Sequence, residues 1–105
     1  MTRLTMQEAA AALKKVPTAF VELFQHGSLK VEWYQPDKTD GQKPHLQDEI
    51  YVIASGNGTF FNDGERTSFN TGDVLFVKAG KVHRFENFTD DFATWVIFYG
   101  PDGGE

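Results

Sequence analysis

Residues 44–56 of this chain read PHLQDEIYVIASG, and residues 72–87 read GDVLFVKAGKVHRFEN. The first segment places His45 and Glu49 four residues apart, at the start of a run of strand-forming residues. The second segment brings His83 shortly after a glycine-containing turn. Two neutral imidazoles and one carboxylate are ligand types that suit a divalent transition metal. The two segments therefore predict a metal site made of His45, Glu49 and His83.

The rest of the chain alternates short apolar runs with turn residues. Asp63-Gly64 is the strongest of the turn signals and predicts a tight hairpin. This alternation is typical of an all-β sandwich or barrel with seven or eight short strands. The expected strands cover residues 20–24, 29–34, 50–53, 58–62, 66–69, 74–77, 83–87 and 93–99.

One helix is expected before the strands. Thr5 and Glu8 have the spacing of a capping box, an alanine-rich run follows, and Pro17 ends it. Its apolar positions recur at helical spacing, which predicts a lid packed against the body. A chain of 105 residues is one domain. We expect a helical segment at 1–17, a β-barrel at 18–99 and a flexible tail at 100–105.

Composition excludes several classes of function. The chain has no cysteine, which rules out disulfides, cysteine nucleophiles and thiolate metal sites. No stretch has the length of a membrane span, and the N-terminal residues lack the apolar core of a signal peptide. The net charge is −5 and the basic residues form no stripe, so neither nucleic acid nor membrane is expected as a partner. A cytoplasmic location is predicted.

Strand alternation predicts how the candidate ligands meet. Along an ideal strand His45, Glu49 and Tyr51 point to one face, while His83, Phe85 and Asn87 form a second inward row. Ligands from two such rows, facing each other across a small barrel, can reach a single ion.

The first segment resembles one conserved motif of the cupin superfamily. Glu49 is followed by six residues and Gly56, as in that motif, and His45 stands where the motif has its second histidine. Lys43 occupies the place of the first histidine, and the leading glycine is displaced to Gly41.

The second segment resembles the other cupin motif. Gly72, Gly80, His83 and Asn87 match it, with Lys78 in place of a proline. The resemblance extends over about residues 29–99. It implies a small double-stranded β-helix (jelly-roll) barrel with an N-terminal helix, and a homodimer, since small cupins commonly pair. Exposed edge strands also favour pairing.

Metal-free interpretations of the same residues stay open. His45 and Glu49 form a buried hydrogen bond in one of them, and His83 is then a core histidine held by backbone groups. Lys43 is either a cavity residue that binds an anion or replaces the charge of the metal, or a surface residue turned outward by Pro44. The second arrangement is favoured.

Further site residues are expected around the metal. Tyr51 and Glu86 are candidate proton carriers. Gln47 and Gln42 are candidate extra oxygen ligands, although a polar surface role is favoured for both. A small apolar pocket needs aromatic lining, and the candidate pocket residues are Lys43, Trp33, Tyr51, Phe76, Phe85 and Trp95.

Two classes of function fit these observations. The first is a metal-dependent enzyme of dioxygenase, isomerase or lyase type that acts on a small oxygenated metabolite, with Fe, Zn, Mn or Ni as the metal. The second is a non-catalytic module that binds a sugar or another small molecule. The fold does not decide between them.

Overall fold

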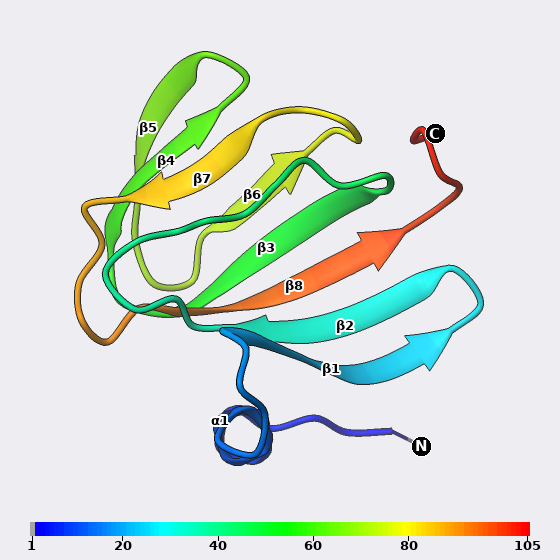
Figure 1. The fold of residues 1–105 in the computed structure, drawn as a ribbon, viewed down its shortest axis with the longest axis vertical. Coiled ribbons are helices and arrows are strands. Elements are labelled where there is room, and N and C mark those ends of the chain that lie inside the picture. The colour runs from blue at the N-terminus through cyan, green and yellow to red at the C-terminus, as the bar shows by residue number, and fades with distance from the viewer. Residues whose placement is uncertain (1) are drawn as a thin grey trace.

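The computed structural model describes residues 2–105 and contains one helix and eight strands (Figure 1). The predicted all-β class is confirmed. Four predicted strands have the bounds expected from sequence, and the others differ by at most two residues at an end. The elements are α1 (Met6–Leu13), β1 (Phe20–His26), β2 (Leu29–Tyr34), β3 (Asp48–Ser55), β4 (Gly58–Asn62), β5 (Glu65–Phe69), β6 (Val74–Val77), β7 (His83–Glu86) and β8 (Ala93–Tyr99).

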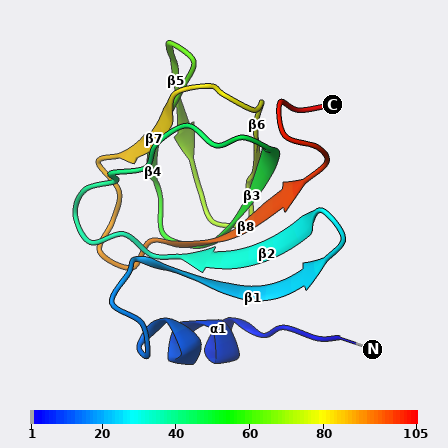
Figure 2. The same ribbon diagram turned by 45° about the vertical axis from the view of Figure 1, so that its right-hand side comes forward.

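The strands form two antiparallel sheets that face each other. The larger sheet has the order β1-β2-β8-β3-β6 and the smaller has the order β5-β4-β7. Figure 2 shows the smaller sheet lying across from the larger one. This is the jelly-roll arrangement, open along one side because the sheets are not joined into a single ring of hydrogen bonds.

The N-terminal helix lies on the outside of the larger sheet (Figure 2). The Thr5 side chain caps it by accepting a hydrogen bond from the backbone N–H of Glu8, at 3.0 Å. Ala9 is fully buried and packs in one cluster with Trp33 and Ala93. The helix ends at Leu13, four residues before Pro17, so the helical part of the 1–17 segment is shorter than predicted.

The core lies between the sheets and is largely aromatic. Rings contact one another edge to face or tilted, with centroids between 4.6 and 5.7 Å apart for the pairs within this group, as aromatic quadrupoles prefer. The core residues are Tyr34, Tyr51, Ile53, Phe60, Phe69, Val77, Phe85, Phe92, Val96 and Phe98. The candidate site lies next to these rings, since the centroids of Tyr51 and His83 are 6.1 Å apart.

Gly56 shows why the first motif ends in glycine. Its φ is +86°, and a Cβ atom there would lie 2.6 Å from Thr89 Oγ1 and 2.7 Å from Phe92 Cα. Glycine alone tolerates both the conformation and the contact. We attribute the sharp exit from β3 to this residue.

Two local expectations are wrong. The tail at 100–105 is not free: Gly103 N–H donates to the Leu46 carbonyl and Glu105 N–H to the Asp48 carboxylate. Asn87 does not continue the inward row of β7, because the strand ends at Glu86 and Asn87 is exposed, with φ +50°.

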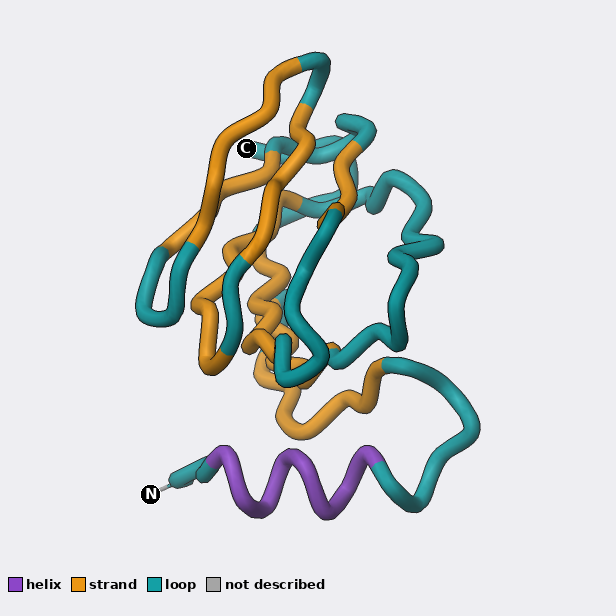
Figure 3. Tube along the Cα trace, turned by 90° about the vertical axis from the view of Figure 1, so that its left-hand side faces the viewer, coloured by secondary structure: helices purple, strands orange, loops and turns teal. Residues whose placement is uncertain are grey.

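Figure 3 shows how much of the chain runs in loops, including a long one between β2 and β3. In the part of the chain that the structure describes, no helix is both long and apolar enough to cross a membrane.

Candidate metal centre

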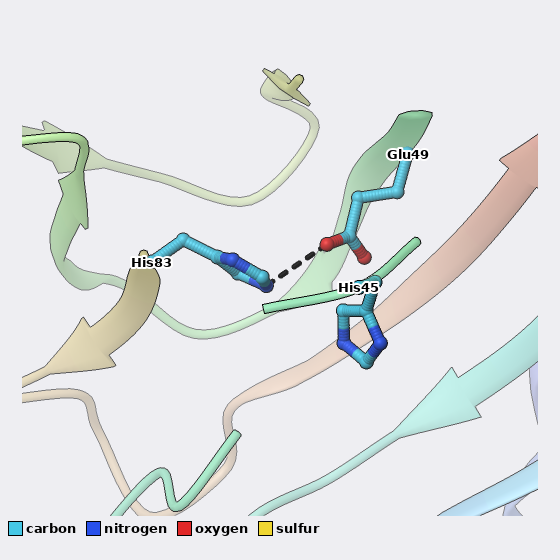
Figure 4. A group of neighbouring side chains, drawn as sticks. All are labelled: His45, Glu49 and His83. Carbon is cyan, nitrogen blue, oxygen red and sulfur yellow. Dashed lines mark ion pairs between the residues drawn. The ribbon is translucent and has the colours of Figure 1, made fainter. Parts of the chain in front are cut away.

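Two side chains that lie four residues apart, His45 and Glu49, meet the distant His83 at one point (Figure 4). Glu49 is the second residue of β3, His83 is the first residue of β7, and His45 lies in the loop before β3. One potential ligand atom from each lies within 4.8 Å of the others. The structure therefore brings together the three predicted metal ligands.

Strand geometry positions two of the three ligands. Glu49 alternates with Ile50 and shares the inward face with Tyr51, and its side chain is 1% exposed. The His83 side chain is fully buried and follows the turn at Gly80, whose φ is +79°. Both ligands are thus held by regular backbone.

His45 is positioned differently from the expectation. It does not lie on a strand in register with Glu49 but in a loop, which the bond from Gly80 N–H to the His45 carbonyl (2.8 Å) ties to the turn before β7. The His45 ring is half-buried against Phe98, with centroids 4.9 Å apart, and 5.4 Å from the His83 ring. A long-range contact, rather than strand alternation, places this ligand.

The hydrogen bonds of His83 determine which nitrogen faces the site. Nδ1–H donates to the Lys81 carbonyl at 2.9 Å. In the neutral ring Nε2 then carries a lone pair, and it lies 2.8 Å from Oε1 of Glu49. Neither Glu49 oxygen nor His83 Nε2 has another hydrogen-bond partner. A lone pair that faces a carboxylate in a buried site is unfavourable unless a cation or a proton lies between them.

This conflict shows that the three residues fit a metal ion. A divalent cation would satisfy the His83 lone pair and the Glu49 carboxylate together, and the Lys81 carbonyl would orient the imidazole as outer partners of metal-bound histidines do. A proton on Nε2 is the metal-free alternative.

The pKa values of the two histidines differ for the same reason. Burial lowers the pKa of His83, but its hydrogen bond to Glu49 and the charge of Glu49 outweigh burial and raise it above the usual value. Burial lowers the pKa of His45, and the charge of Glu49 opposes this only in part. His45 is accordingly a neutral ligand near pH 7, whereas His83 must release its proton to bind a metal.

A cavity of about 1030 Å³ opens beside His45. The β2–β3 loop contributes Gln42 and Lys43 to its wall, and β2 and β8 contribute Glu32 and Phe98. This volume is at the upper end of the range typical of small-molecule sites. One of the candidate metal ligands, His45, thus borders a space large enough for a metabolite.

Most of the predicted pocket residues lie elsewhere. Only Lys43 lines the cavity, as an exposed residue. Phe85 and Tyr51 belong to the core, and only the hydroxyl of Tyr51 approaches the loop, donating to Gln42 Oε1 at 2.9 Å. The remaining three do not reach the cavity: Trp33 and Trp95 pack under α1, and Phe76 is exposed on β6.

The two candidate proton carriers do not gain support from their surroundings. Glu86 points away from the site and pairs with Arg66 and Arg84, each at 2.8 Å. Burial raises the pKa of the Tyr51 hydroxyl well above its usual value, which keeps it protonated. Tyr51 is therefore a hydrogen-bond donor near the site.

Glu32 is a cavity residue that the sequence analysis missed. It faces inward from β2, and burial together with the charges of Glu22 and Glu49 raises its pKa to about 7, against the opposing charge of Lys30. A signal was present, since the polar residues Lys30 and Glu32 alternate with Val31 and Trp33. This pattern marks a strand whose inner face borders a polar space rather than a dry core.

Replacing Glu32 with glutamine is expected to stabilise the metal-free protein at pH 8 by about 1 kcal/mol, a value discounted for partial exposure. The folded carboxyl has the raised pKa, so ionised Glu32 costs stability. That cost grows between about pH 4.5, where the unfolded group ionises, and about pH 7. The two proteins should be equally stable near pH 4.

Urea denaturation of both proteins with a chelator present measures this difference in stability, with Glu65→Gln at an exposed site as the control. A constant difference at all pH values would contradict the assignment.

The fold and the two-histidine, one-carboxylate cluster define a jelly-roll protein with a candidate metal centre. Comparisons with known proteins identify its family. The cupin domain family matches residues 31–99, and the chain belongs to this family.

The relatives give the family but no shared activity. An uncharacterized protein of Streptomyces coelicolor is 34% identical over 86 residues, which are 80% of this chain and 82% of that protein. A crystal structure of unknown function from Rhizobium leguminosarum has a TM-score of 0.76 at 15% identity, covering 96% of this chain and 98% of that one. A structure from Thermotoga maritima, described as a predicted oxalate decarboxylase, has a TM-score of 0.59 at 25% identity and covers 74% and 76%.

Proposed function

We propose that this protein is a metal-dependent enzyme that acts on a small oxygenated metabolite, with His45, Glu49 and His83 as metal ligands. The observation that carries the proposal is the buried pair of His83 Nε2 and Glu49 Oε1, 2.8 Å apart and without another hydrogen-bond partner, in which Nε2 of the neutral ring would turn a lone pair toward the carboxylate. Fe, Zn, Mn and Ni are the candidate metals. When bound, the metal would act as a Lewis acid toward an oxygen of the substrate or as a site for oxygen.

The residues around the centre have separate roles in this proposal. Phe98 packs against the His45 ring and gives the cavity an apolar wall that limits water at the ligands. Glu32, with a pKa of about 7, can hold or release a proton near neutral pH on the cavity wall. The exposed Lys43 on the cavity wall can pair with an anionic group of a substrate. The lyase type is supported by the likeness to the predicted oxalate decarboxylase.

A non-catalytic binding module is the second candidate. This candidate is favoured because neither predicted proton carrier is suited to that role. Glu86 forms ion pairs on the outer face, and Tyr51 stays protonated. In that case the metal and the cavity would retain a sugar or another small molecule without turnover. A chelator would then abolish binding of the ligand, and no product would form with any metal.

Elemental analysis of the untagged protein tests the metal proposal. Near-stoichiometric metal, or its uptake during anaerobic reconstitution with iron, zinc, manganese and nickel in turn, is the expected result. Failure to take up any of these metals would overturn the proposal and leave Lys43 at the rim of a metal-free cavity.

We also propose that the chain forms a homodimer through the outer face of the larger sheet. One apolar row crosses four strands there, each residue paired with the next: Val31, Ile97, Ile50 and Phe76. The chain carries a net charge of −5, so a second copy meets least repulsion at an uncharged face. Strands with apolar residues on both faces are typical of sheets covered on both sides.

The predictions of a cytoplasmic location and of no nucleic-acid partner stay predictions.

Replacing Phe76 with aspartate is expected to convert this dimer to a monomer. Phe76 is 51% exposed, so the charge is tolerated in the free chain but not against a second apolar face. Sedimentation equilibrium should give twice the chain mass of 11.8 kDa for the parent protein and 11.8 kDa for the variant. Val82→Asp is the control, because Val82 is 52% exposed outside the sheets. A parent protein that sediments as a monomer would refute the proposal.

A further inference from the structure

Gln42 lies beside the candidate metal centre, one residue before the lysine that replaces the first motif histidine. Its side-chain carbonyl oxygen Oε1 is 3.4 Å from His45 Nε2 and accepts a hydrogen bond from the Tyr51 hydroxyl at 2.9 Å. The side chain comes from the β2–β3 loop and lines the cavity. An amide oxygen is therefore held next to one of the metal ligands.

Asp40 fixes which end of this amide faces the centre. The Gln42 side-chain Nε2 donates to Asp40 Oδ2 at 2.9 Å, and the Gln42 backbone N–H donates to Oδ1 at 3.0 Å. Asp40 is itself anchored, because it accepts hydrogen bonds from the Tyr34 hydroxyl and from the backbone N–H of Phe85. With its nitrogen engaged by the carboxylate, the amide must direct its oxygen toward His45 and Tyr51.

The separation between Gln42 Oε1 and His45 Nε2 is longer than a well-formed N–H···O hydrogen bond. It does match two ligands of one ion, since atoms about 2.0 to 2.2 Å from a common metal lie about 3 to 3.5 Å apart. A carbonyl oxygen has two lone pairs. The Tyr51 hydroxyl takes one, and the other is free for a cation.

We propose that Gln42 Oε1 is a fourth protein ligand of the metal, supplying the position at which Lys43 replaces a histidine. The inference rests on the proposed metal function. Asp40 and Tyr51 then act as the outer partners that orient this ligand. Four protein ligands leave an open position only at an ion with five or six ligands, which favours Fe²⁺, Mn²⁺ or Ni²⁺ over four-coordinate Zn²⁺.

The other candidate glutamine provides a matched control. Gln47 also lines the cavity, but its side-chain amide donates to the carbonyls of Ser28 and Gly100, at 2.9 Å each. Those bonds turn it away from the ligand cluster. The structure thus distinguishes two glutamines that the sequence alone does not separate.

Titration of the metal-free protein with Co²⁺, followed by its visible absorption bands, tests the inference. Gln42→Ala is expected to weaken Co²⁺ binding at least tenfold and to shift the bands, because one ligand is lost. Gln47→Ala should leave affinity and bands unchanged. Gln42→Glu retains an oxygen ligand and adds charge, so it should bind Co²⁺ at least as tightly as the parent protein. The thermal midpoint of each metal-free variant controls for folding.

The outcomes separate this inference from the proposed function. If the parent protein binds no Co²⁺, the metal function itself fails. If His83→Ala abolishes binding while Gln42→Ala changes neither affinity nor spectrum, the metal function stands and the fourth ligand is refuted. Weaker binding with unchanged bands would make Gln42 a positioning residue for His45, which also overturns the inference. If Gln42→Ala does not fold, loss of Co²⁺ binding or bands identical to those of the parent protein in a folded Gln42→Glu decides against the inference.

Discussion

Replacing His83 with alanine is expected to reduce the bound metal from near-stoichiometric to background. His83 Nε2 is the buried donor closest to Glu49, and Nδ1 is already engaged by the Lys81 carbonyl. The two remaining candidate ligands, Glu49 and His45, come from a strand end and a loop and do not enclose an ion by themselves. Elemental analysis of the purified variant measures the loss.

The same substitution also tests the electrostatics of the site. Removing one partner of a buried pair costs about 3–5 kcal/mol, because the Glu49 carboxylate is left without a cation or a donor. Glu49→Gln removes that charge at nearly constant volume, so it should lose the metal and keep the fold. His26→Ala is the control, since His26 is exposed at the end of β1. Full metal content in both site variants would contradict the assignment of the ligands.

Metal addition is expected to raise the unfolding temperature by about 10–20 °C. A ligand at a hundred times its dissociation constant stabilises the native state by about 2.7 kcal/mol, and a domain of this size gains about 4–8 °C for each kcal/mol. The unfolded chain offers only three histidines and no cysteine, so it competes poorly for the ion. Calorimetry with and without metal, followed by excess chelator, measures the shift and its reversal.

The pH dependence of this stabilisation has a definite sign. The pKa of His83 is raised in the metal-free fold, so its contribution to stability is fully present below about pH 6.5 and is lost as pH rises through the folded value. The metal must displace that proton. The metal-induced shift should therefore grow as pH rises above about 6.5. A shift that is equal at pH 6 and pH 8, or one that persists in His83→Ala, would show that the ion binds elsewhere.

The order and type of the elements were predictable because local signals dominate them. The strands β2, β4, β6 and β8 have the bounds that alternation and turn residues predicted, and Thr5 caps the helix as expected. Buried strands carry strong period-two patterns, and glycine in turns has a steric reason that is visible in sequence. Gly56, with φ +86°, is the clearest case.

The three candidate ligands lie together as predicted, but for partly different reasons. Glu49 and His83 lie on strands, where parity fixes the direction of a side chain. His45 reaches the same point from a loop tied to Gly80, which no local pattern encodes. The pocket aromatics were misplaced because the larger sheet is apolar on both faces, and residue type alone does not tell Trp95 from Phe98.

Local chemistry in the chain was thus sufficient for the all-β class, for the strand order along the sequence and for the identity of three candidate ligands. Tertiary contacts were needed for the cavity wall and for the orientation of Gln42. The physical reason is the range of the forces involved. Strand direction and turns depend on neighbouring residues, whereas the β2–β3 loop is held by Asp40 bonds to Tyr34 and to the distant backbone of Phe85. Such a loop acquires its conformation only when both sheets are in place.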